Sequence, residues 1–349
     1  MQAPAEPLAK GHARMLIDTG AQITEDPFGI EAAAQAAESA GYDGFTVPET
    51  RHDAFITLAL AARVTSRITL SSAIAVAFAR NPMTMAYQAN DVQLISGGRF
   101  ILGLGSQVRP HIQRRFAMPW SQPAARMEEF ITALRAIWAS WASGEKLAFR
   151  GEFYQHTLMT PFFNPGPNPH GNPQVMLAAV GEHMTSVAGR AADGILCHSF
   201  TTEAYLRERT LPALGAARGS LDGFALCLAP FVVLGSDEKS RAAAEKGVRE
   251  QIAFYGSTPA YRPVLELHGW GDLGDQLNVL SRRQEWAEMG NLIGDDVLSA
   301  FAVSGTPAQV ATALQQRFGD IVTRMSLYTP YHYDRADIEA VTTALRIAA

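Results

Sequence analysis

The stretch ITLSSAIAVAFARNPMTMAYQANDVQLISGGRFILGLGS, residues 68–106, holds one complete unit of a pattern that recurs along the chain. It begins with an apolar, β-prone run at 68–75 and continues through a helical segment at 83–95 that a Pro precedes and a Gly follows. It ends in a second apolar run, 100–105. Pro is favoured at the start of a helix and Gly just after its end. The stretch therefore predicts a strand, a helix and a second, parallel strand in succession.

The same alternation of apolar runs and Ala-rich amphipathic segments extends in both directions from Arg14 onward. Eight runs have the length and composition of strands, namely 14–19, 44–49, 68–75, 100–105, 174–180, 194–198, 224–234 and 324–328. Helical segments follow them at 28–40, 55–64, 83–95, 123–143, 183–191, 202–218, 238–254 and 334–346, with a further helix at 307–318. Eight such pairs fit a closed barrel better than an open doubly wound sheet. We predict an α/β fold, a (β/α)8 TIM barrel.

Two stretches interrupt the alternation, one after the fourth strand at 146–173 and one before the eighth at 256–305. The first begins with KLAFRGEFYQH, which alternates like a hairpin, and continues as a Pro- and Gly-rich loop, whereas the second predicts several short helices. Long connections after barrel strands cover the mouth at the strand carboxyl ends, so we expect lid material in both insertions. Residues 1–12 lack periodicity and predict a flexible lead-in, and 13–349 predict a single barrel domain.

Composition excludes several classes of protein. With 349 residues, 47% hydrophobic and 18% charged, the chain can bury a large core. Its 29 Lys and Arg are scattered among 34 Asp and Glu, for a net charge of −5, so no basic block predicts nucleic-acid binding. Cys197 and Cys227 are too few for a disulfide framework. Because neither a signal peptide nor an apolar run of roughly 18 residues is found, we expect a cytoplasmic protein without a membrane partner.

Reacting groups of a barrel enzyme lie at the carboxyl ends of its strands. His52, His111 and His198 follow such ends, but no His-x-His pair marks a metal site, and we assign no metal. Gly181 opens a strand-to-helix turn, where free N–H groups can bind a phosphate, although an ordinary tight turn has the same sequence. A protonated His198 would add a charge-assisted hydrogen bond there. The residues alone thus predict a barrel enzyme that binds a phosphate-bearing ligand.

Five segments carry a resemblance to a known family, and they are GYDGFTVPET (41–50), the opening stretch (68–106), LRAIW (134–138), GEFY (151–154) and AAVGEHMTSVAGRAADGILCH (178–198). With these segments the chain resembles the luciferase-like monooxygenase superfamily, and within it the coenzyme F420 (deazaflavin)-dependent oxidoreductases. The segments recur in order through most of residues 14–330. The resemblance implies a (β/α)8 barrel, an oxidoreductase, a small-molecule substrate and a homodimer.

The resemblance also implies cofactor-binding positions. Glu49, the acid that closes the second strand, corresponds to the residue that faces the polar edge of the deazaflavin or flavin ring. A bulge with a non-proline cis peptide, which supports the ring, corresponds to Ser72–Ala73. The remaining positions are implied near the ribityl chain or the phosphate, and they are Gly105, Ser106, Val180, Gly181, Glu182, Cys197 and His198.

The chain departs from the resembled family at two positions. Relatives that oxidise a sugar phosphate carry a His after the strand-two acid and a Glu after the fourth strand, where this chain has Thr50 and Val108. This removes the base and the acid of that mechanism, so sugar-phosphate oxidation is not expected, and His52 remains the candidate catalytic residue. The substrate side, suited to an anionic or carbonyl-bearing substrate, is implied to include Arg80, Gln107, Arg109 and His111.

Three functions remain open. The first is hydride transfer between bound F420 and a small organic substrate, in which the protein orients the reactants. The second is an FMN-dependent monooxygenase of the same fold, and oxygen uptake separates the two because a deazaflavin does not support oxygen chemistry. The third is a non-catalytic flavin-binding protein, which Thr50 and Val108 leave open. We expect tighter binding of F420 than of FMN.

Overall fold

A computed structural model of the chain describes residues 14–21 and 27–348. The predicted lead-in, residues 1–12, lies outside the described residues. The chain divides into two compact units. We call residues 18–179 with 183–196 the amino-terminal unit, and the described residues of 14–17, 180–182 and 197–348 the carboxyl-terminal unit.

The sheet has the strand topology that the sequence predicts. Its strands are β1 (Leu16–Gly20), β2 (Gly44–Val47), β3 (Thr69–Ser72), β4 (Ala75–Val76), β5 (Phe100–Gly105), β8 (Gln174–Ala179), β9 (Gly194–Cys197), β10 (Ala225–Leu228) and β13 (Arg324–Met325). The order is β3-β2-β1-β13-β10-β9-β8-β5-β4, and β3 also pairs with β5, so the order closes on itself. Since β4 continues β3 after a short interruption, this is the topology of an eight-stranded (β/α)8 barrel, and the predicted fold class is confirmed.

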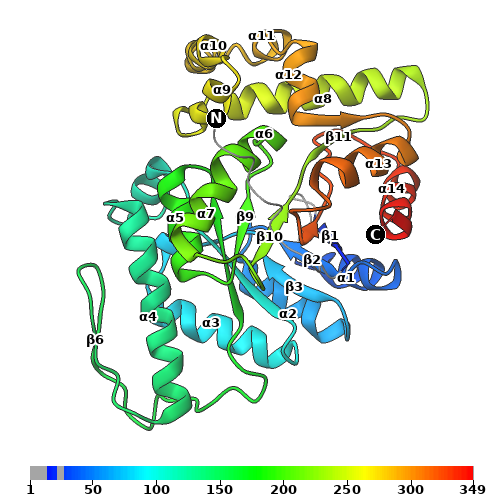
Figure 1. The fold of residues 1–349 in the computed structure, drawn as a ribbon. Coiled ribbons are helices and arrows are strands. Elements are labelled where there is room, and N and C mark those ends of the chain that lie inside the picture. The colour runs from blue at the N-terminus through cyan, green and yellow to red at the C-terminus, as the bar shows by residue number, and fades with distance from the viewer. Residues whose placement is uncertain (1–13, 22–26, 349) are drawn as a thin grey trace. The chain divides into compact units, whose positions relative to one another are not determined.

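Helices follow the strands as predicted (Figure 1). They are α1 (Ile30–Ser39), α2 (Ala54–Val64), α3 (Pro82–Ile95), α4 (Pro123–Ser143), α5 (Glu182–Ala191), α6 (Glu203–Tyr205), α7 (Leu211–Arg218), α13 (Pro307–Phe318) and α14 (Arg335–Ala348). The predicted helix at 202–218 is divided by a π-helical turn, Leu206–Thr210. Asn81 accepts a hydrogen bond from the backbone N–H of Thr84 at 2.9 Å, and Pro82 follows it, so this pair sets where α3 begins.

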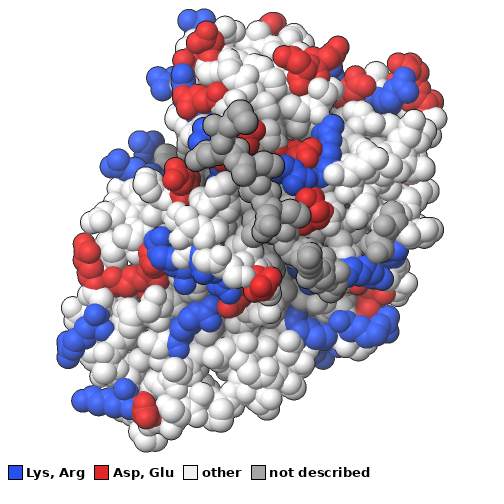
Figure 2. Space-filling model, in the orientation of Figure 1, with Lys and Arg blue, Asp and Glu red and all other residues white. Residues whose placement is uncertain are grey.

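Each unit has its own buried apolar side chains. In the amino-terminal unit the large ones include Phe45, Leu58, Leu70, Phe100, Phe130 and Trp138. A separate cluster in the carboxyl-terminal unit includes Phe200, Phe231, Val248, Ile252, Leu265 and Leu277. Charged side chains of both signs are interspersed on the faces of the units that Figure 2 shows.

Both predicted insertions contain secondary structure. In 146–173, β6 (Phe149–Arg150) pairs antiparallel with β7 (Gln155–His156), as the hairpin prediction requires. The predicted seventh strand divides at Pro230, which has no N–H for a strand ladder, into β10 and β11 (Phe231–Val233). The end of 256–305 forms β12 (Ala302–Ser304), a strand that the sequence did not predict and that pairs parallel with β11. Between them lie α8 (Glu238–Gly256), α9 (Arg262–Leu267), α10 (Gly271–Arg282), α11 (Trp286–Asn291) and α12 (Asp295–Phe301).

The lid prediction is wrong for the end of 146–173. The hydroxyl of Tyr87 donates to the carbonyl of Phe163 at 2.6 Å, and the amide of Gln93 donates to the carbonyl of Gly171 at 3.3 Å. Going along the insertion from Phe163 to Gly171, the contacted residue of α3 lies closer to the carboxyl end of that helix. The carboxyl end of α3 is connected to the amino end of β5. The insertion follows a helix and not a strand, so it returns to the amino ends of the strands. The assignment of lid material to 256–305 stays a prediction.

Candidate functional site

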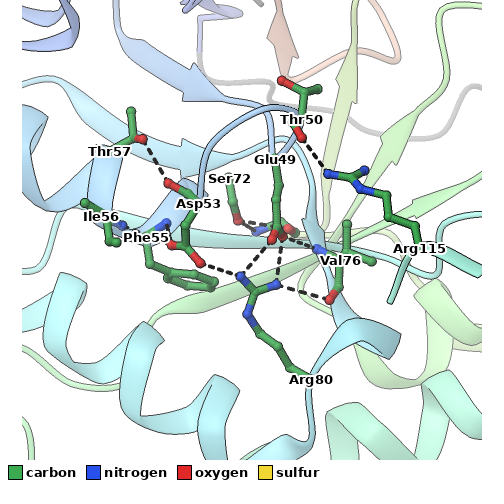
Figure 3. Close-up of polar contacts among 11 residues, drawn as sticks. Glu49, Thr50, Asp53, Phe55, Ile56, Thr57, Ser72, Val76, Arg80 and Arg115 are labelled. Carbon is green, nitrogen blue, oxygen red and sulfur yellow. Dashed lines mark hydrogen bonds and ion pairs between the residues drawn. The ribbon is translucent and has the colours of Figure 1, made fainter. Parts of the chain in front are cut away.

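A buried ion-pair network lies at the carboxyl ends of β2 and β4 in the amino-terminal unit (Figure 3). The guanidinium of Arg80 reaches Glu49 through Nη1 to Oε2 at 2.8 Å and through Nη2 to Oε1 at 2.7 Å. Its Nη2 also lies 2.6 Å from Oδ2 of Asp53. Only 8% of the Glu49 side chain and 11% of the Arg80 side chain are exposed. Paired bonds of this kind fix both the position and the orientation of the carboxylate.

Arg80 is the shared counter-ion of the two carboxylates in this network. Burial by itself lowers the pKa of Arg80, but hydrogen bonding to Glu49 and the charges of Glu49 and Asp53 outweigh it, and the pKa is raised. The other oxygen of Asp53 accepts the backbone N–H groups of Phe55 and Ile56 at the start of α2, at 2.8 and 3.1 Å. Arg80, implied to line the substrate side, is thus held between two carboxylates. Its position favours a role as their counter-ion.

The acid and the strand-three bulge, two separate sequence predictions, meet in the structure. The backbone N–H of Val76 donates to Oε2 of Glu49 at 2.7 Å, and the N–H of Glu49 donates to the carbonyl of Ile74 at 3.3 Å. The cis peptide lies between Ala73 and Ile74. The predicted position, Ser72–Ala73, is therefore wrong by one residue. Ser72 is still part of β3, and the interruption between β3 and β4 falls after it.

The side chain of Ser72 is bonded to the neighbouring strand β5. Its side chain is fully buried, and its hydroxyl donates to the carbonyl of Gly103 at 2.8 Å and accepts the N–H of Gly103 at 3.0 Å. A Cβ at Gly103 would lie 1.9 Å from the carbonyl oxygen of Ser72, and one at Gly105 would lie 2.8 Å from the side chain of Ile74. The two glycines of β5 therefore allow close approach to β3 and to the bulge. A ligand-binding role for Gly105 stays a prediction.

The segment after β5 carries the other predicted residues of this unit. Gln107 has a positive φ of 58°, and its side-chain oxygen accepts the N–H of Val108 at 2.9 Å. The hydroxyl of Ser106 donates to the carbonyl of Gln107 at 3.1 Å. A π-helical turn, η2 (His111–Arg115), follows, and π-helical turns are frequent at functional sites. Of the predicted residues near this edge, those exposed to solvent are His52, Arg109 and His111.

The residues that the resemblance implies for phosphate binding belong to the carboxyl-terminal unit. Gly181 directly precedes α5, and a Cβ added to it would meet no atom within 4 Å. Glu182 is exposed at the first position of α5. The hydroxyl of Tyr205 donates to the carbonyl of Val180 at 3.3 Å. The open space at Gly181 beside the start of a ten-residue helix suits the approach of a phosphate to backbone N–H groups.

His198 lies in an aromatic environment. Its ring centroid is 4.6 Å from that of Tyr255 and 4.7 Å from that of Tyr261. The backbone N–H of Phe200 donates to His198 Nδ1 at 3.0 Å, so the neutral ring carries its proton on Nε2. Burial lowers the pKa of His198 to about 4. The imidazole is therefore neutral near pH 7, and the predicted charge-assisted bond is replaced by an uncharged Nε2–H donor.

The thiol of Cys197 and the two tyrosines in contact with His198 are uncharged at neutral pH as well. Burial raises the pKa of the Cys197 thiol above its ordinary value, and Cys197 and Cys227 are free cysteines. Burial also raises the pKa of Tyr261 to about 12. The hydroxyl of Tyr255 lies 3.1 Å from that of Tyr328. Sequence reasoning missed these tyrosines, because they come from separate elements and share no spacing.

No group of three or more His, Cys, Asp or Glu side chains in 14–21 and 27–348 is arranged to hold a metal ion. None of the helices in that part of the chain is long and apolar enough to span a membrane.

The chain is similar to known proteins in sequence and in fold. The family model for luciferase-like monooxygenase matches residues 9–324. The chain is 52% identical over 297 residues to uncharacterized protein Rv1360 of Mycobacterium tuberculosis, covering 84% of this chain and 87% of that protein. It is 28% identical over 288 residues to the putative coenzyme F420-dependent oxidoreductase Rv3520c of the same organism, covering 77% and 82%.

Solved structures show the same fold. The coenzyme F420-dependent tetrahydromethanopterin reductase of Methanopyrus kandleri superposes with a TM-score of 0.78 at 19% identity, covering 96% of this chain and 99% of that one. The chain therefore belongs to the luciferase-like monooxygenase family. It is an enzyme of the oxidoreductase class.

Proposed function

We propose that this chain is a coenzyme F420-dependent oxidoreductase that transfers a hydride between the deazaflavin and a small organic substrate. The observation that carries the proposal is the hydrogen bonding of Glu49 to the backbone of Ile74 and Val76, since the acid and the strand-three bulge are the two features implied to hold the ring. The similarity to a relative named as F420-dependent supports the same cofactor.

The residues at the bulge fit the polar edge of a planar ring. The Glu49 carboxylate accepts three hydrogen bonds from Val76 and Arg80, while a carboxylate has about four acceptor positions. One acceptor position remains for an N–H of the ring. Ala73 and Ile74 are half-buried beside it and can support a ring face.

The proposed phosphate contacts use backbone donors and one neutral side chain. The free N–H groups at the start of α5, next to the open space at Gly181, would hold the phosphate, with the helix dipole favouring its negative charge. The Nε2–H of His198 would donate without a charge. Glu182 contributes only its backbone, because its carboxylate would repel the phosphate.

When bound, the deazaflavin supplies a ring carbon that accepts or donates the hydride, so the protein needs to orient its reactants and to manage a proton. Thr50 and Val108 offer neither base nor acid. His52, exposed in the turn after β2, is the proposed proton carrier. An inactive His52→Gln variant with native cofactor affinity would support this role.

The alternative is an FMN-dependent monooxygenase, which the family name itself favours. Oxygen consumption separates the two functions. We expect that, in the presence of the protein and reduced FMN, oxygen is consumed at the same rate with and without candidate substrates. Substrate-dependent oxygen uptake would favour the alternative, and failure to bind either cofactor in a redox-competent form would favour a non-catalytic flavin-binding protein.

The proposal includes a homodimer located in the cytoplasm. The family resemblance supports the dimer, and the two free cysteines suit a reducing compartment. Light scattering of the purified protein tests the dimer, and cell fractionation tests the location. A monomeric mass, or recovery in a secreted or membrane fraction, would contradict this part of the proposal.

A further inference from the structure

The loops that follow β2 and β5 carry four exposed arginines, and of these only Arg109 was implied by the family resemblance to lie on the substrate side. They are Arg51, Arg109, Arg114 and Arg115, which we call the arginine rim. Within residues 14–21 and 27–348, the ion pairs join none of these four to an Asp or Glu. By contrast, Arg80, Arg135 and Arg190 of the same unit each reach a carboxylate within 3.0 Å.

A direct contact brings the two loops together. Nη2 of Arg115 donates to the carbonyl of Thr50 at 2.7 Å, and Figure 3 shows Arg115 reaching toward Thr50 near the Glu49–Arg80 pair. Arg51 and Arg114 are the immediate neighbours of these two residues. The two loops that carry the four arginines therefore meet at the edge of the sheet that carries the proposed site.

The backbone of the rim is held in an unusual conformation. Gln107 and Ala117 have positive φ values of 58° and 54°, which residues other than Gly rarely adopt. The π-helical turn η2 lies between them and carries Arg114 and Arg115. Residues in such sparsely populated conformations cluster at binding sites, because the surrounding structure has to maintain them.

The charges at this edge are out of balance in the positive direction. The acids beside the rim, Glu49 and Asp53, share the single positive charge of Arg80, which leaves one negative charge against the four arginines. The chain as a whole carries a net charge of −5, so the rim has the opposite sign to the molecule. A local positive field of this kind attracts small anions and raises their concentration at the site.

We infer that the arginine rim binds a carboxylate or phosphate group of a small ligand, which makes the substrate of the proposed oxidoreductase an anionic molecule. This inference rests on the proposed function for the identity of the substrate, but not for the anion site itself. Guanidinium groups form paired hydrogen bonds with both carboxylates and phosphates. The Nε of Arg109 is held by Gln113 at 2.8 Å, so its two terminal nitrogens remain to bind the anion.

The first test measures anion binding with two probes, pyrophosphate and citrate, by titration calorimetry at low salt. The rim variant is Arg109→Gln with Arg114→Gln. The matched control is Arg63→Gln with Arg67→Gln, which removes the same charge from exposed positions of the same unit near the carboxyl end of α2. We expect the rim variant to weaken probe binding about tenfold or more, and the control variant less than about twofold.

The outcomes decide the inference directly. Binding that both variants weaken equally would be an effect of net charge, and it would overturn the rim as a site. Absence of probe binding to the native protein would overturn it too. A preference for citrate over pyrophosphate would assign a carboxylate, and the reverse a phosphate.

A second titration identifies the source of the anionic group. The same variants are titrated with oxidised F420, whose fluorescence reports binding. If the rim variant binds F420 as tightly as the native protein, the anionic group belongs to the substrate. If the rim variant loses affinity for F420 as it does for the probes, the rim binds the cofactor, and the inference of an anionic substrate is overturned. If the native protein does not bind F420, the proposed function fails, while the probe titration still decides whether the rim is an anion site.

Discussion

Arg80 binds Glu49 through both of its terminal nitrogens, at 2.8 and 2.7 Å, and nine-tenths of each side chain is buried. The same guanidinium holds Asp53, which caps α2. One residue thus connects the end of β2, the strand β4 and the start of α2. This connection fixes the carboxylate that we propose for the cofactor ring.

Loss of Arg80 is expected to destabilise the protein. The Arg80→Met variant leaves the Glu49 carboxylate buried without its counter-ion, which we expect to cost about 3 kcal/mol. Urea unfolding of the native and variant proteins measures the loss. In the control, Arg190→Met, the broken pair with Glu128 is exposed, and the expected loss is below about 1 kcal/mol. Equal losses in the two variants would contradict a special role for the buried pair.

Loss of the Glu49 charge is expected to weaken cofactor binding. Glu49→Gln removes a charge-assisted hydrogen bond to the ring, worth roughly 1.5–3 kcal/mol, or about ten- to a hundredfold in F420 affinity. Fluorescence titration measures the change. Asp53→Asn is the control, since it disturbs the same network through Arg80 without touching the proposed ring contact. If both variants lose affinity to the same extent, Glu49 acts only through the network.

A side chain at position 181 is expected to weaken binding of the cofactor phosphate without lowering the stability of the protein. The space around this residue is open, so Gly181→Val should leave the melting temperature near the native value. The valine side chain would obstruct the approach of a phosphate to the N–H groups at the start of α5. We expect the variant to bind phosphorylated F420 about tenfold more weakly, with a smaller change for the dephosphorylated analogue. Equal losses for the two ligands would exclude Gly181 from the phosphate site.

His198 is expected to make the protein less stable in mild acid. Burial lowers its pKa from 6.5 to about 4, so below pH 6.5 the unfolded chain binds a proton that the folded protein does not. Stability is therefore lost as pH falls from about 6.5 toward 4. The contribution between pH 7 and pH 5 is about 2 kcal/mol.

Urea unfolding at pH 7 and pH 5 tests this contribution by comparison with His198→Gln. Burial also lowers the pKa values of His156 and His268, so the native protein loses stability from several sites. The difference between native and variant isolates His198. A variant with the same pH dependence as the native protein would contradict the assigned pKa.

The sequence predicted the strand and helix pattern well, because hydrophobic periodicity and helix-terminal Pro and Gly are local signals. It placed β5 and α4 at their observed bounds. It failed where tertiary contacts decide. The bulge lies one residue later than predicted because Ser72 is held in β3 by Gly103, and β12 forms because β11 offers it a parallel partner.

The candidate site shows the same division. Glu49 could be selected from its position after β2, but nothing in the sequence shows that Arg80, which lies 31 residues later, is its counter-ion. Tyr255 and Tyr328 lie 57 and 130 residues after His198 along the chain. Only the folded structure reveals that His198 is neutral.

Direct titration of the purified protein with oxidised F420 and with FMN tests the central claim, the choice of cofactor. We predict that F420 binds at least about tenfold more tightly than FMN, a difference of about 1.4 kcal/mol. Equal or tighter binding of FMN would contradict the assignment of this chain as an F420-dependent oxidoreductase.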